Sequence, residues 1–556
     1  MIEKNFISLI EESIQQHWTS YALTNYTEGN SYTFGDVAKE IARRHEIYAH
    51  AGVQPGDKIA LMGKDTAEWC IGFLSIVTYG AIIVPILQDF PVNDAESIIT
   101  HSEAKILMVS TNIWAQMKSE NMPGVTASID IQTGQTLMDK TPNQKLSLAI
   151  SEKDKFFAEK YPNGLNPADI NYHKTPNSEI VLINYTSGTT GFSKGVMITG
   201  NNLAGNVTFA VSKKILLEGD PIICFLPLAH MYSCAFNFLL PIAAGAHIYL
   251  LGKIPAPHVL TTAFKKVKPK LIISVPLVME KIYQKSILPK IQDSKVKLLL
   301  QLPFFSSIIR KKIRKELMKG LGGEFRQMII GGAPLSKEVG EFLYDINFPF
   351  TVGYGMTECA PLITYSYWEE WKLGSCGKAL PGIMEVRINY EENTTSMKDV
   401  GEIQVRGENV CLGYFKNPEQ TANLFTDDGW MKTGDLGYVD AQGYLFIKGR
   451  SKTMLLGANG QNIYPEEIES KINNNAFILE NVVVSRNGKL TAIIVPDQKA
   501  IMEAGLTMEQ AWDEIERFRA HLNEQLGSYE KIIRFERRDV EFEKTPKQSI
   551  KRFLYN

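Results

Sequence analysis

One stretch organises the chain: Tyr185-Thr186-Ser187-Gly188-Thr189-Thr190-Gly191-Phe192-Ser193-Lys194-Gly195-Val196-Met197-Ile198-Thr199. It follows an apolar run at residues 180–183 and precedes an expected helix near Asn201. Its glycines allow the backbone to bend and to approach a ligand closely. Such a loop can surround a polyphosphate with N–H groups, hydroxyl groups and one ammonium charge. The alternative is a plain surface loop, which a Ser/Thr/Gly tract on its own forms more often.

Similar loops recur where other expected strands end. A short apolar strand at 221–226 leads into Pro227-Leu228-Ala229-His230-Met231-Tyr232, and strands at 327–330 and 349–352 lead into residues 331–336 and 353–358. Open α/β sheets bind their ligands at the carboxyl ends of strands. A histidine such as His230 also has a purely structural alternative. Because several strand ends carry Gly, hydroxyl, aromatic and acidic groups, the set predicts one ligand site.

Hydrophobic periodicity predicts an α/β fold. Expected strands at 58–62, 81–86 and 104–109 alternate with helices, which is typical of a mainly parallel sheet covered on both faces. From Glu385 onward, shorter alternating runs separated by Gly and Asp turns predict an antiparallel β-subdomain. We therefore expect a large N-terminal domain of parallel-rich sheets at 1–451, with the β-subdomain at 385–451. A small mobile C-terminal α+β domain follows at 452–556. The polar residues 140–178 are expected to form a surface excursion.

Composition excludes several function classes. The 556 residues carry a net charge of −2, so no global field attracts nucleic acid. The six cysteines are scattered singly, which indicates neither a zinc site nor a disulfide framework and fits a reducing cytoplasm. The first 18 residues have no long apolar core and are not expected to be a signal peptide. The uncharged run 71–87 is interrupted by Gly80 and Pro85, which favours a buried helix and strand over a membrane span.

Residues 281–319 form a basic segment with interspersed apolar runs. Its cations are Lys281, Lys285, Lys290, Lys295, Lys297, Arg310, Lys311, Lys312, Arg314, Lys315 and Lys319. A basic amphipathic helix indicates a peripheral contact with an anionic membrane, here at its inner face. The alternative is a helical pair packed on the domain with a solvated basic face.

Five separated segments together resemble the adenylate-forming superfamily, which includes acyl- and aryl-CoA synthetases, luciferases and peptide-synthetase adenylation domains. They are residues 185–195, 227–232, 353–358, 433–437 with 449–450, and 457–469, and the resemblance covers roughly residues 20–556. Gly353-Tyr354-Gly355-Met356-Thr357-Glu358, residues 274–283 and the basic segment look like the long-chain fatty acyl-CoA synthetase branch.

The resemblance implies a two-step reaction with ATP, Mg²⁺ and coenzyme A. A fatty acid carboxylate attacks the α-phosphorus of ATP to give acyl-AMP and pyrophosphate. A thiol then displaces AMP. The thiol is that of coenzyme A or, as the alternative, that of acyl carrier protein. Cations and donors around the phosphates are needed because an anion must approach a polyanion.

The resemblance also implies roles for individual residues. Thr357 would donate to the α-phosphate, Glu358 would ligate Mg²⁺, and His230 would close the site between acyl chain and thiol. Tyr354 would stack on adenine, and Asp435 and Arg450 would bind the ribose. Lys452 matches the family's hinge, where the small domain rotates between half-reactions. The remaining nucleotide- or thiol-side positions are Thr186, Ser187, Gly188, Thr189, Thr190, Lys194, Gly332, Ala333, Pro334, Gly355, Met356 and Gly457.

The C-terminal tail departs from the family pattern. The family carries a lysine four residues after a Thr, and alignment on Thr545 and Ile550 puts Ser549 at that position. Electrostatic contacts of this kind contribute ~10²–10³-fold in rate. Lys547 and Lys551 are each two residues away and would share a face with Ser549 in an extended strand. Three hypotheses follow: a working synthetase that uses Lys547 or Lys551, a slow adenylating enzyme that still forms thioesters, or a binding protein without turnover.

Overall fold

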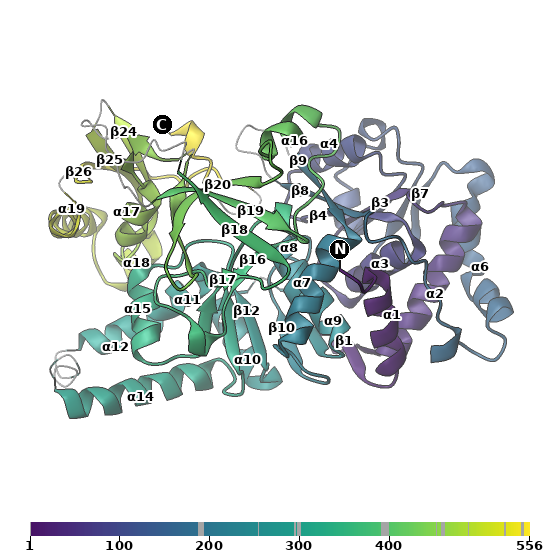
Figure 1. Ribbon diagram of the computed structural model, residues 1–556, viewed down its shortest axis with the longest axis horizontal. Helices are drawn as coiled ribbons and strands as arrows, with labels where there is room; N and C mark the ends of the chain where they lie inside the picture. The colour runs from purple at the N-terminus through teal and green to yellow at the C-terminus, as the bar shows by residue number, and fades with distance from the viewer. Residues whose placement is uncertain are drawn as a thin grey trace.

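The structure is a computed structural model. It describes the chain except for residues 1, 187–193, 254, 294–295, 297, 299–301, 391–399, 452, 457–461, 487–488, 528–529, 546–549 and 556. Two seven-stranded sheets, a four-stranded antiparallel sheet and a three-stranded C-terminal sheet carry the architecture (Figure 1). The predicted α/β class, with large parallel-rich sheets, a β-subdomain and a small α+β unit, is confirmed.

The first large sheet has the order β7-β6-β5-β3-β4-β8-β9. Its central strands pair in parallel, and β7 and β9 add antiparallel edges. The parallel strands are buried on both faces, which explains their continuous apolar runs. Their bounds are β3 Lys58–Met62, β4 Ile82–Ile86, β5 Ile106–Val109, β6 Ala127–Asp130, β7 Thr136–Asp139, β8 Ile180–Thr186 and β9 Lys194–Thr199.

The second large sheet has the order β14-β13-β12-β10-β11-β1-β2. All its neighbours pair in parallel except β1 and β2. The carboxyl ends of β10, β12, β13 and β14 therefore meet at one edge of the sheet. The bounds are β1 Tyr21–Asn25, β2 Ser31–Thr33, β10 Pro221–Cys224, β11 His247–Leu250, β12 Leu271–Ser274, β13 Gln327–Ile330 and β14 Phe350–Val352.

Helices cover these sheets. Residues 140–178, predicted as a surface excursion, contain α6 (Lys145–Lys160), a helix that was not predicted and that packs against α2 (Phe34–Ala51). Leu146 and Ala149 are buried, and the Arg43 guanidinium lies 4.6 Å from the Phe157 ring centroid. The many charged residues of α6 make this short apolar stripe hard to recognise in the sequence. Other covering helices are α1 Phe6–Gln16, α3 Ala67–Tyr79, α4 Val92–Ser102, α7 Gly200–Ser212, α10 Pro257–Val267, α11 Pro276–Ile282, α12 Leu288–Gln292, α14 Pro303–Gly320 and α15 Lys337–Asp345.

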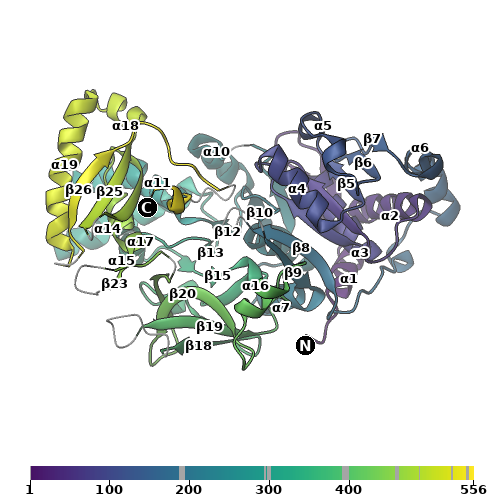
Figure 2. The same ribbon diagram turned by 90° about the horizontal axis from the view of Figure 1, so that it is seen from above.

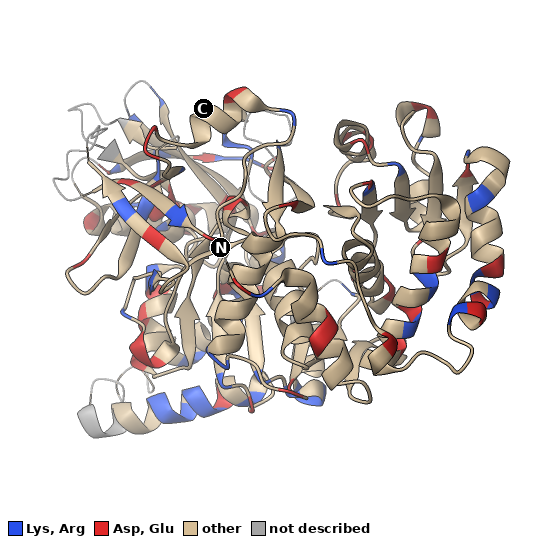
Figure 3. Cartoon of the chain, turned by 45° about the vertical axis from the view of Figure 1, so that its right-hand side comes forward, with Lys and Arg blue, Asp and Glu red and all other residues tan. Residues whose placement is uncertain are grey.

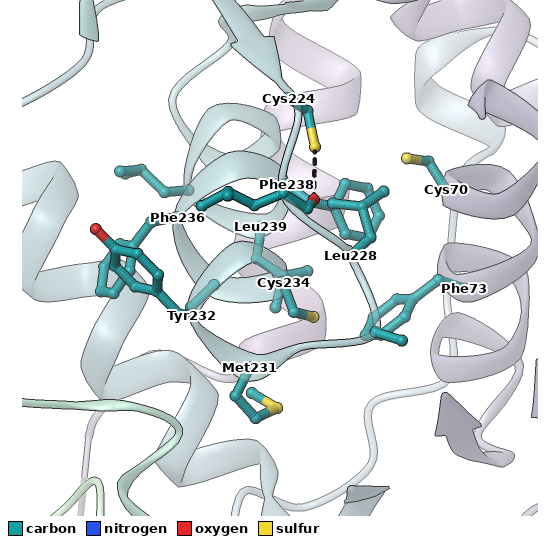
Figure 4. Close-up of a cluster of buried hydrophobic side chains, with 14 of the residues drawn as sticks. Cys70, Phe73, Cys224, Leu228, Met231, Tyr232, Cys234, Phe236, Phe238 and Leu239 are labelled. Carbon is teal, nitrogen blue, oxygen red and sulfur yellow. Dashed lines mark hydrogen bonds between the residues drawn. The ribbon is translucent and has the colours of Figure 1, made fainter. Parts of the chain in front are cut away.

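The uncharged run 71–87 lies inside this core, as predicted. It forms most of α3 and all of β4. In Figure 4, Cys70 and Phe73 of α3 face the apolar side chains of the helical segment that follows β10, including Phe238. All six cysteines are free thiols. In the described part of the chain, no helix combines the length and the hydropathy that a membrane span needs.

The C-terminal third consists of the β-subdomain and the small unit, which lie beside the large sheets in Figure 2. The four-stranded sheet contains β18 Met384–Asn389, β19 Gly401–Gly407, β20 Met431–Val439 and β21 Leu445–Arg450, all antiparallel. The small unit contains α17 Pro465–Ile472, β24 Ile478–Arg486, β25 Lys489–Pro496, α18 Gln498–Glu503, α19 Met508–Gln525 and β26 Ile532–Arg537. An apolar cluster of Val400, Leu436 and Tyr464 joins the two.

Candidate functional site

Tyr354, Asp435 and Arg450 form one half of the site. Tyr354 begins the two-residue strand β15 (Tyr354–Gly355) directly after β14, and its hydroxyl donates to Asp435 Oδ2 over 2.6 Å. Asp435 on β20 and Arg450 on β21 are cross-strand partners, and Arg450 Nε lies 3.2 Å from Asp435 Oδ1. The antiparallel register pairs Asp435 with Arg450, and the hydrogen bond adds Tyr354, so the three residues that the resemblance assigned to adenine and ribose lie together.

The Asp435 carboxylate lies in an environment that opposes its charge. Its side chain is 9% exposed, whereas that of Arg450 is 67% exposed. Burial raises the pKa of the Asp435 carboxyl, and the Arg450 guanidinium and the Tyr354 hydroxyl oppose this rise. Burial and the neighbouring Asp435 carboxylate also raise the pKa of Tyr354 well above its ordinary value, so the phenol is a hydrogen-bond donor.

Glu358, Tyr414 and Lys194 form the other half. Glu358 is buried in the one-turn helix η6 (Thr357–Cys359), and its Oε1 accepts a 2.9 Å hydrogen bond from the Tyr414 hydroxyl. Lys194 Nζ lies 4.8 Å from the Tyr414 ring centroid and donates to Gln420 Oε1 over 2.8 Å. Tyr414 therefore connects Lys194, which follows the predicted phosphate-binding loop, to Glu358, the predicted metal ligand. The described residues contain no group of three or more metal-ligating side chains.

The segment that carries Thr357 and Glu358 is fixed by buried amide groups. Asn206 on α7 is fully buried, accepts from the Leu362 N–H over 2.9 Å and donates to the Cys359 carbonyl over 3.2 Å. The Cys411 N–H donates to the Glu358 carbonyl over 2.8 Å. Thr357 is itself buried. Because its backbone is held on both sides, this segment presents its side chains in a fixed orientation.

The loop with His230 follows β10 of the second large sheet and is held by residues of the first. Asn184 on β8 donates to the Ala229 carbonyl over 2.9 Å, and Asp65 Oδ1 accepts from the Leu228 N–H over 3.0 Å. His230 is the N-cap of the short helix α8 (Met231–Ser233), and its Nδ1 accepts from the Tyr232 N–H over 3.3 Å. Burial raises the pKa of the Asp65 carboxyl to about 7.

The loop after β13 forms the neighbouring wall. Gly332 has a φ of +87°, which favours glycine, and Gly332, Ala333 and Pro334 are exposed. The Tyr232 hydroxyl donates to the Ile329 carbonyl over 3.0 Å and so ties this strand end to the His230 loop. On the far side, Glu280 Oε1 accepts from the Ser336 N–H over 3.0 Å.

Several of the predicted site residues lie outside the described residues, and others have only local contacts. Ser187, Gly188, Thr189, Thr190, Lys452, Gly457, Lys547 and Ser549 lie outside the described residues. Thr186 and Lys194 are cross-strand partners at the two ends of the phosphate-loop stretch. Gly355 is exposed and Met356 half-buried beside Tyr354. Lys551 Nζ lies 3.7 Å from Glu543 Oε2, so its described ion pair is within the C-terminal unit.

Sequence reasoning missed the residues that position the site. Tyr414, Gln420, Asn184, Asn206 and Asp65 contact predicted site residues or their loops through side chains that are distant in sequence. Tyr414 is 56 residues from Glu358, and no local pattern marks it. The sequence does place Asn and Asp residues next to apolar strands. Such residues indicate a hydrogen-bond partner elsewhere in the chain, because a buried polar group needs one.

Comparisons with known proteins identify the family of this chain. Residues 10–415 match the family described as AMP-binding enzyme, and residues 452–555 match its C-terminal domain. The chain is 28% identical over 483 residues to the long-chain-fatty-acid–CoA ligase FadD15 of Mycobacterium bovis, covering 81% of this chain and 75% of that protein. It is 26% identical over 524 residues to the long-chain-fatty-acid–CoA ligase ACSBG2 of Gallus gallus, covering 88% and 67%.

Solved structures share the fold. ATP-bound MatB from Rhodopseudomonas palustris superposes with a TM-score of 0.75 at 23% identity, covering 99% of this chain and 98% of that one. The o-succinylbenzoate coenzyme A synthetase MenE from Bacillus subtilis, in complex with ATP and magnesium ion, gives a TM-score of 0.73 at 20% identity, covering 98% of each chain. By its match over most of its length, this chain belongs to the AMP-binding enzymes, the adenylate-forming family that includes acyl-CoA ligases.

Proposed function

We propose that this enzyme activates a long-chain fatty acid with ATP and transfers the acyl group to coenzyme A. Family membership supports the adenylating chemistry, and the names of the relatives FadD15 and ACSBG2 favour a long-chain acid. The observation that carries the proposal is the convergence of Tyr354, Asp435 and Arg450 with Glu358, Tyr414 and Lys194. One half suits a nucleoside and the other suits a polyphosphate.

In the first half-reaction a fatty acid carboxylate oxygen attacks the α-phosphorus of ATP. The bond from that phosphorus to the bridging oxygen breaks, and pyrophosphate leaves. We assign ribose binding to Asp435 and Arg450 and phosphate binding to Thr186, Lys194 and Thr357. Tyr354 borders the adenine position and holds the Asp435 carboxylate. Fixed donors and cations lower the repulsion between the two anions, which is the main barrier.

The Glu358 carboxylate fits a magnesium ion. Only its Oε1 has a hydrogen-bond partner in the described part of the chain, which leaves Oε2 for a cation. Mg²⁺ is usually held by one or two carboxylates together with substrate phosphates. When bound, it neutralises phosphate charge. The Tyr414 hydroxyl fixes the orientation of the carboxylate, as hydrogen-bond partners of metal ligands commonly do.

In the second half-reaction the coenzyme A sulfur attacks the acyl carbonyl carbon. The bond from that carbon to the AMP oxygen breaks, and AMP leaves with both of its bonding electrons. We assign closure of the site during adenylation to His230, with Gly332, Ala333 and Pro334 as the neighbouring wall. Lys452 is the proposed hinge for rotation of residues 452–556, with Gly457 approaching the thiol side after rotation.

We place the acyl chain in the apolar region beside this wall, between the second large sheet and helices α10 and α11. Apolar side chains line this region, among them Phe225, Ile272 and Met328, and they are closely packed, so they would have to move apart to admit the chain. Burial of each methylene contributes about 0.8 kcal/mol, which would favour a long chain there.

Ser549 supports a second candidate function. Without a lysine at that position, the chain can bind ATP and an acyl group while adenylation is slow. Pyrophosphate release from ATP with a panel of fatty acids separates the two functions. Release that depends on a long-chain acid, followed by thioester formation with coenzyme A, supports the synthetase. Thioester formation from supplied acyl-AMP without pyrophosphate release supports the impaired enzyme. Formation with acyl carrier protein and not with coenzyme A contradicts the proposed acceptor.

A further inference from the structure

Helix α14 (Pro303–Gly320) presents one strongly basic face to solvent. Lys311, Lys312, Lys315 and Lys319 are exposed, and their spacing of three and four residues puts them on one side of the helix. The opposite side packs on the domain through the buried Leu317 and the partly buried Ile313. In Figure 3 blue bands of Lys and Arg recur along α14 at the lower edge of the molecule, with one red band among them.

These four lysines have no carboxylate partner at ion-pair distance among the described residues. The nearby acidic groups pair elsewhere: Glu316 lies 3.0 Å from Lys290, and Asp345 lies 3.3 Å from Arg310. By contrast, lysines on other helices pair with neighbouring acids, as Lys155 does with Glu152 and Lys160 with Glu46. The positive charge of the α14 face is therefore offset only in part, by Glu316 near Lys312, although the whole chain has a net charge of −2.

One exposed aliphatic side chain lies on the same face, and two more lie in the segment before the helix. Ile308 is 51% exposed and shares the outward side of α14 with Lys312, Lys315 and Lys319. Leu302 immediately before the helix is 46% exposed, and Leu298 is 63% exposed. Exposure of Ile308 among the lysines, and of Leu302 and Leu298 before the helix, is unfavourable in water but suits the boundary between lipid headgroups and acyl chains.

We propose that the outer face of α14 is a docking surface for an anionic lipid bilayer. The lysines complement lipid phosphate and carboxylate groups, and Ile308, Leu302 and Leu298 enter the outer layer of the bilayer. A nucleic acid would also attract the lysines, but it offers no apolar environment for the exposed aliphatic residues. The proposal is independent of the chemistry at the candidate site.

Vesicle co-sedimentation of the full chain tests the proposal. We expect binding to vesicles of equal parts phosphatidylcholine and phosphatidylserine, and little binding to phosphatidylcholine alone. Each lysine near an anionic surface strengthens binding about five-fold, so replacing all four with Gln should weaken binding at least ~100-fold. Raising NaCl from ~0.1 M to ~0.5 M should also weaken binding, since exposed charges are screened. Ile308→Ser should reduce binding with the lysines intact.

A matched control removes the same charge elsewhere. Lys145, Lys155, Lys489 and Lys499 are exposed lysines of α6 and the C-terminal unit, and their combined replacement with Gln should leave vesicle binding within ~2-fold of wild type. Circular dichroism and thermal unfolding verify folding of each variant. Equal binding of the wild type to both vesicle types, or equal loss in the control variant, overturns the proposal. Binding to polyuridylic acid without binding to vesicles identifies a nucleic-acid surface and also overturns it.

Discussion

The Tyr354 hydroxyl and the Asp435 carboxylate are joined by a 2.6 Å hydrogen bond across 81 residues of sequence. Both side chains are buried, and they come from different sheets of the molecule. The bond therefore connects the loop after β14 to the β-subdomain at the position we assign to the nucleoside. Since a buried carboxylate depends on its partners, this contact is open to a direct test.

Removing the Tyr354 hydroxyl should weaken nucleotide binding. In Tyr354→Phe the Asp435 carboxylate loses a charge-assisted hydrogen bond of about 1.5–3 kcal/mol and keeps only the exposed Arg450. We expect the KM for ATP to rise by ~10-fold or more, with the KM for the fatty acid nearly unchanged. Tyr438→Phe is the control. Tyr438 lies on β20, the strand of Asp435, but its ring stacks on Phe446. Equal changes in both variants would refute a specific role for the contact.

Replacing Glu358 with Gln should impair the use of magnesium. The amide oxygen can still accept from the Tyr414 hydroxyl, but the negative charge is lost. We expect the Mg²⁺ concentration for half-maximal activity to rise by ~10–100-fold, with thermal unfolding close to wild type. Glu369→Gln changes an exposed carboxylate and serves as the control. An unchanged Mg²⁺ titration in Glu358→Gln would contradict the assignment.

Asp65 should make stability depend on pH. Burial raises its pKa from 3.8 to about 7 in the folded chain, against the opposing effect of the Leu228 N–H, and the Asp89 carboxylate adds to the rise. The folded state therefore holds the proton more tightly than the unfolded state, so the free energy of unfolding falls as pH rises from about 4 to about 7.

Asp65→Asn should remove this dependence, because the amide oxygen still accepts from Leu228 and never ionises. At about pH 8 we expect a gain of at most about 4 kcal/mol, reduced because solvent reaches part of the carboxyl. Urea unfolding at about pH 5 and about pH 8 measures the effect. Asp513→Asn on exposed α19 is the control. A variant that keeps the wild-type pH slope would show that Asp65 is not its source.

The C-terminal lysines should affect only adenylation. If Lys547 or Lys551 replaces the missing lysine, its change to Ala should slow pyrophosphate release by ~10²–10³-fold and leave thioester formation from acyl-AMP intact. Lys551→Ala also breaks the pair with Glu543, so Glu543→Gln isolates that loss. In that case Ser549→Lys should change the rate of pyrophosphate release little. Strong release from Ser549→Lys and none from wild type would rule out a substitute lysine.

Local patterns predicted much of the fold because apolar runs and strand-end loops are local features. The strand at 327–330 has the same bounds in the structure, and the uncharged run 71–87 forms the expected helix and strand. Strand β20 was not predicted, because its Thr433-Gly434-Asp435 segment lacks alternating apolar residues. The strand nevertheless forms because its neighbours β19 and β21 supply hydrogen bonds on both sides.

The candidate site was less accessible to sequence reasoning. The residues of the five segments could be named from a resemblance, but the side chains that position them could not. Tyr414 and Glu358 are 56 residues apart in sequence, and Asp65 and Leu228 are 163 residues apart, so each pair forms its hydrogen bond only in the folded chain. Such pairings depend on topology, and no period in the sequence encodes them.

The most direct test of the central claim follows all products of one reaction by mass spectrometry. Purified chain is mixed with Mg²⁺, ATP and a long-chain fatty acid, first without and then with coenzyme A. The account predicts acyl-AMP and pyrophosphate in the first mixture, and acyl-CoA with AMP in the second. Neither acyl-AMP nor acyl-CoA should form when ATP is omitted. Absence of acyl-AMP and acyl-CoA for every chain length tested, under conditions where ATP binds, would contradict it.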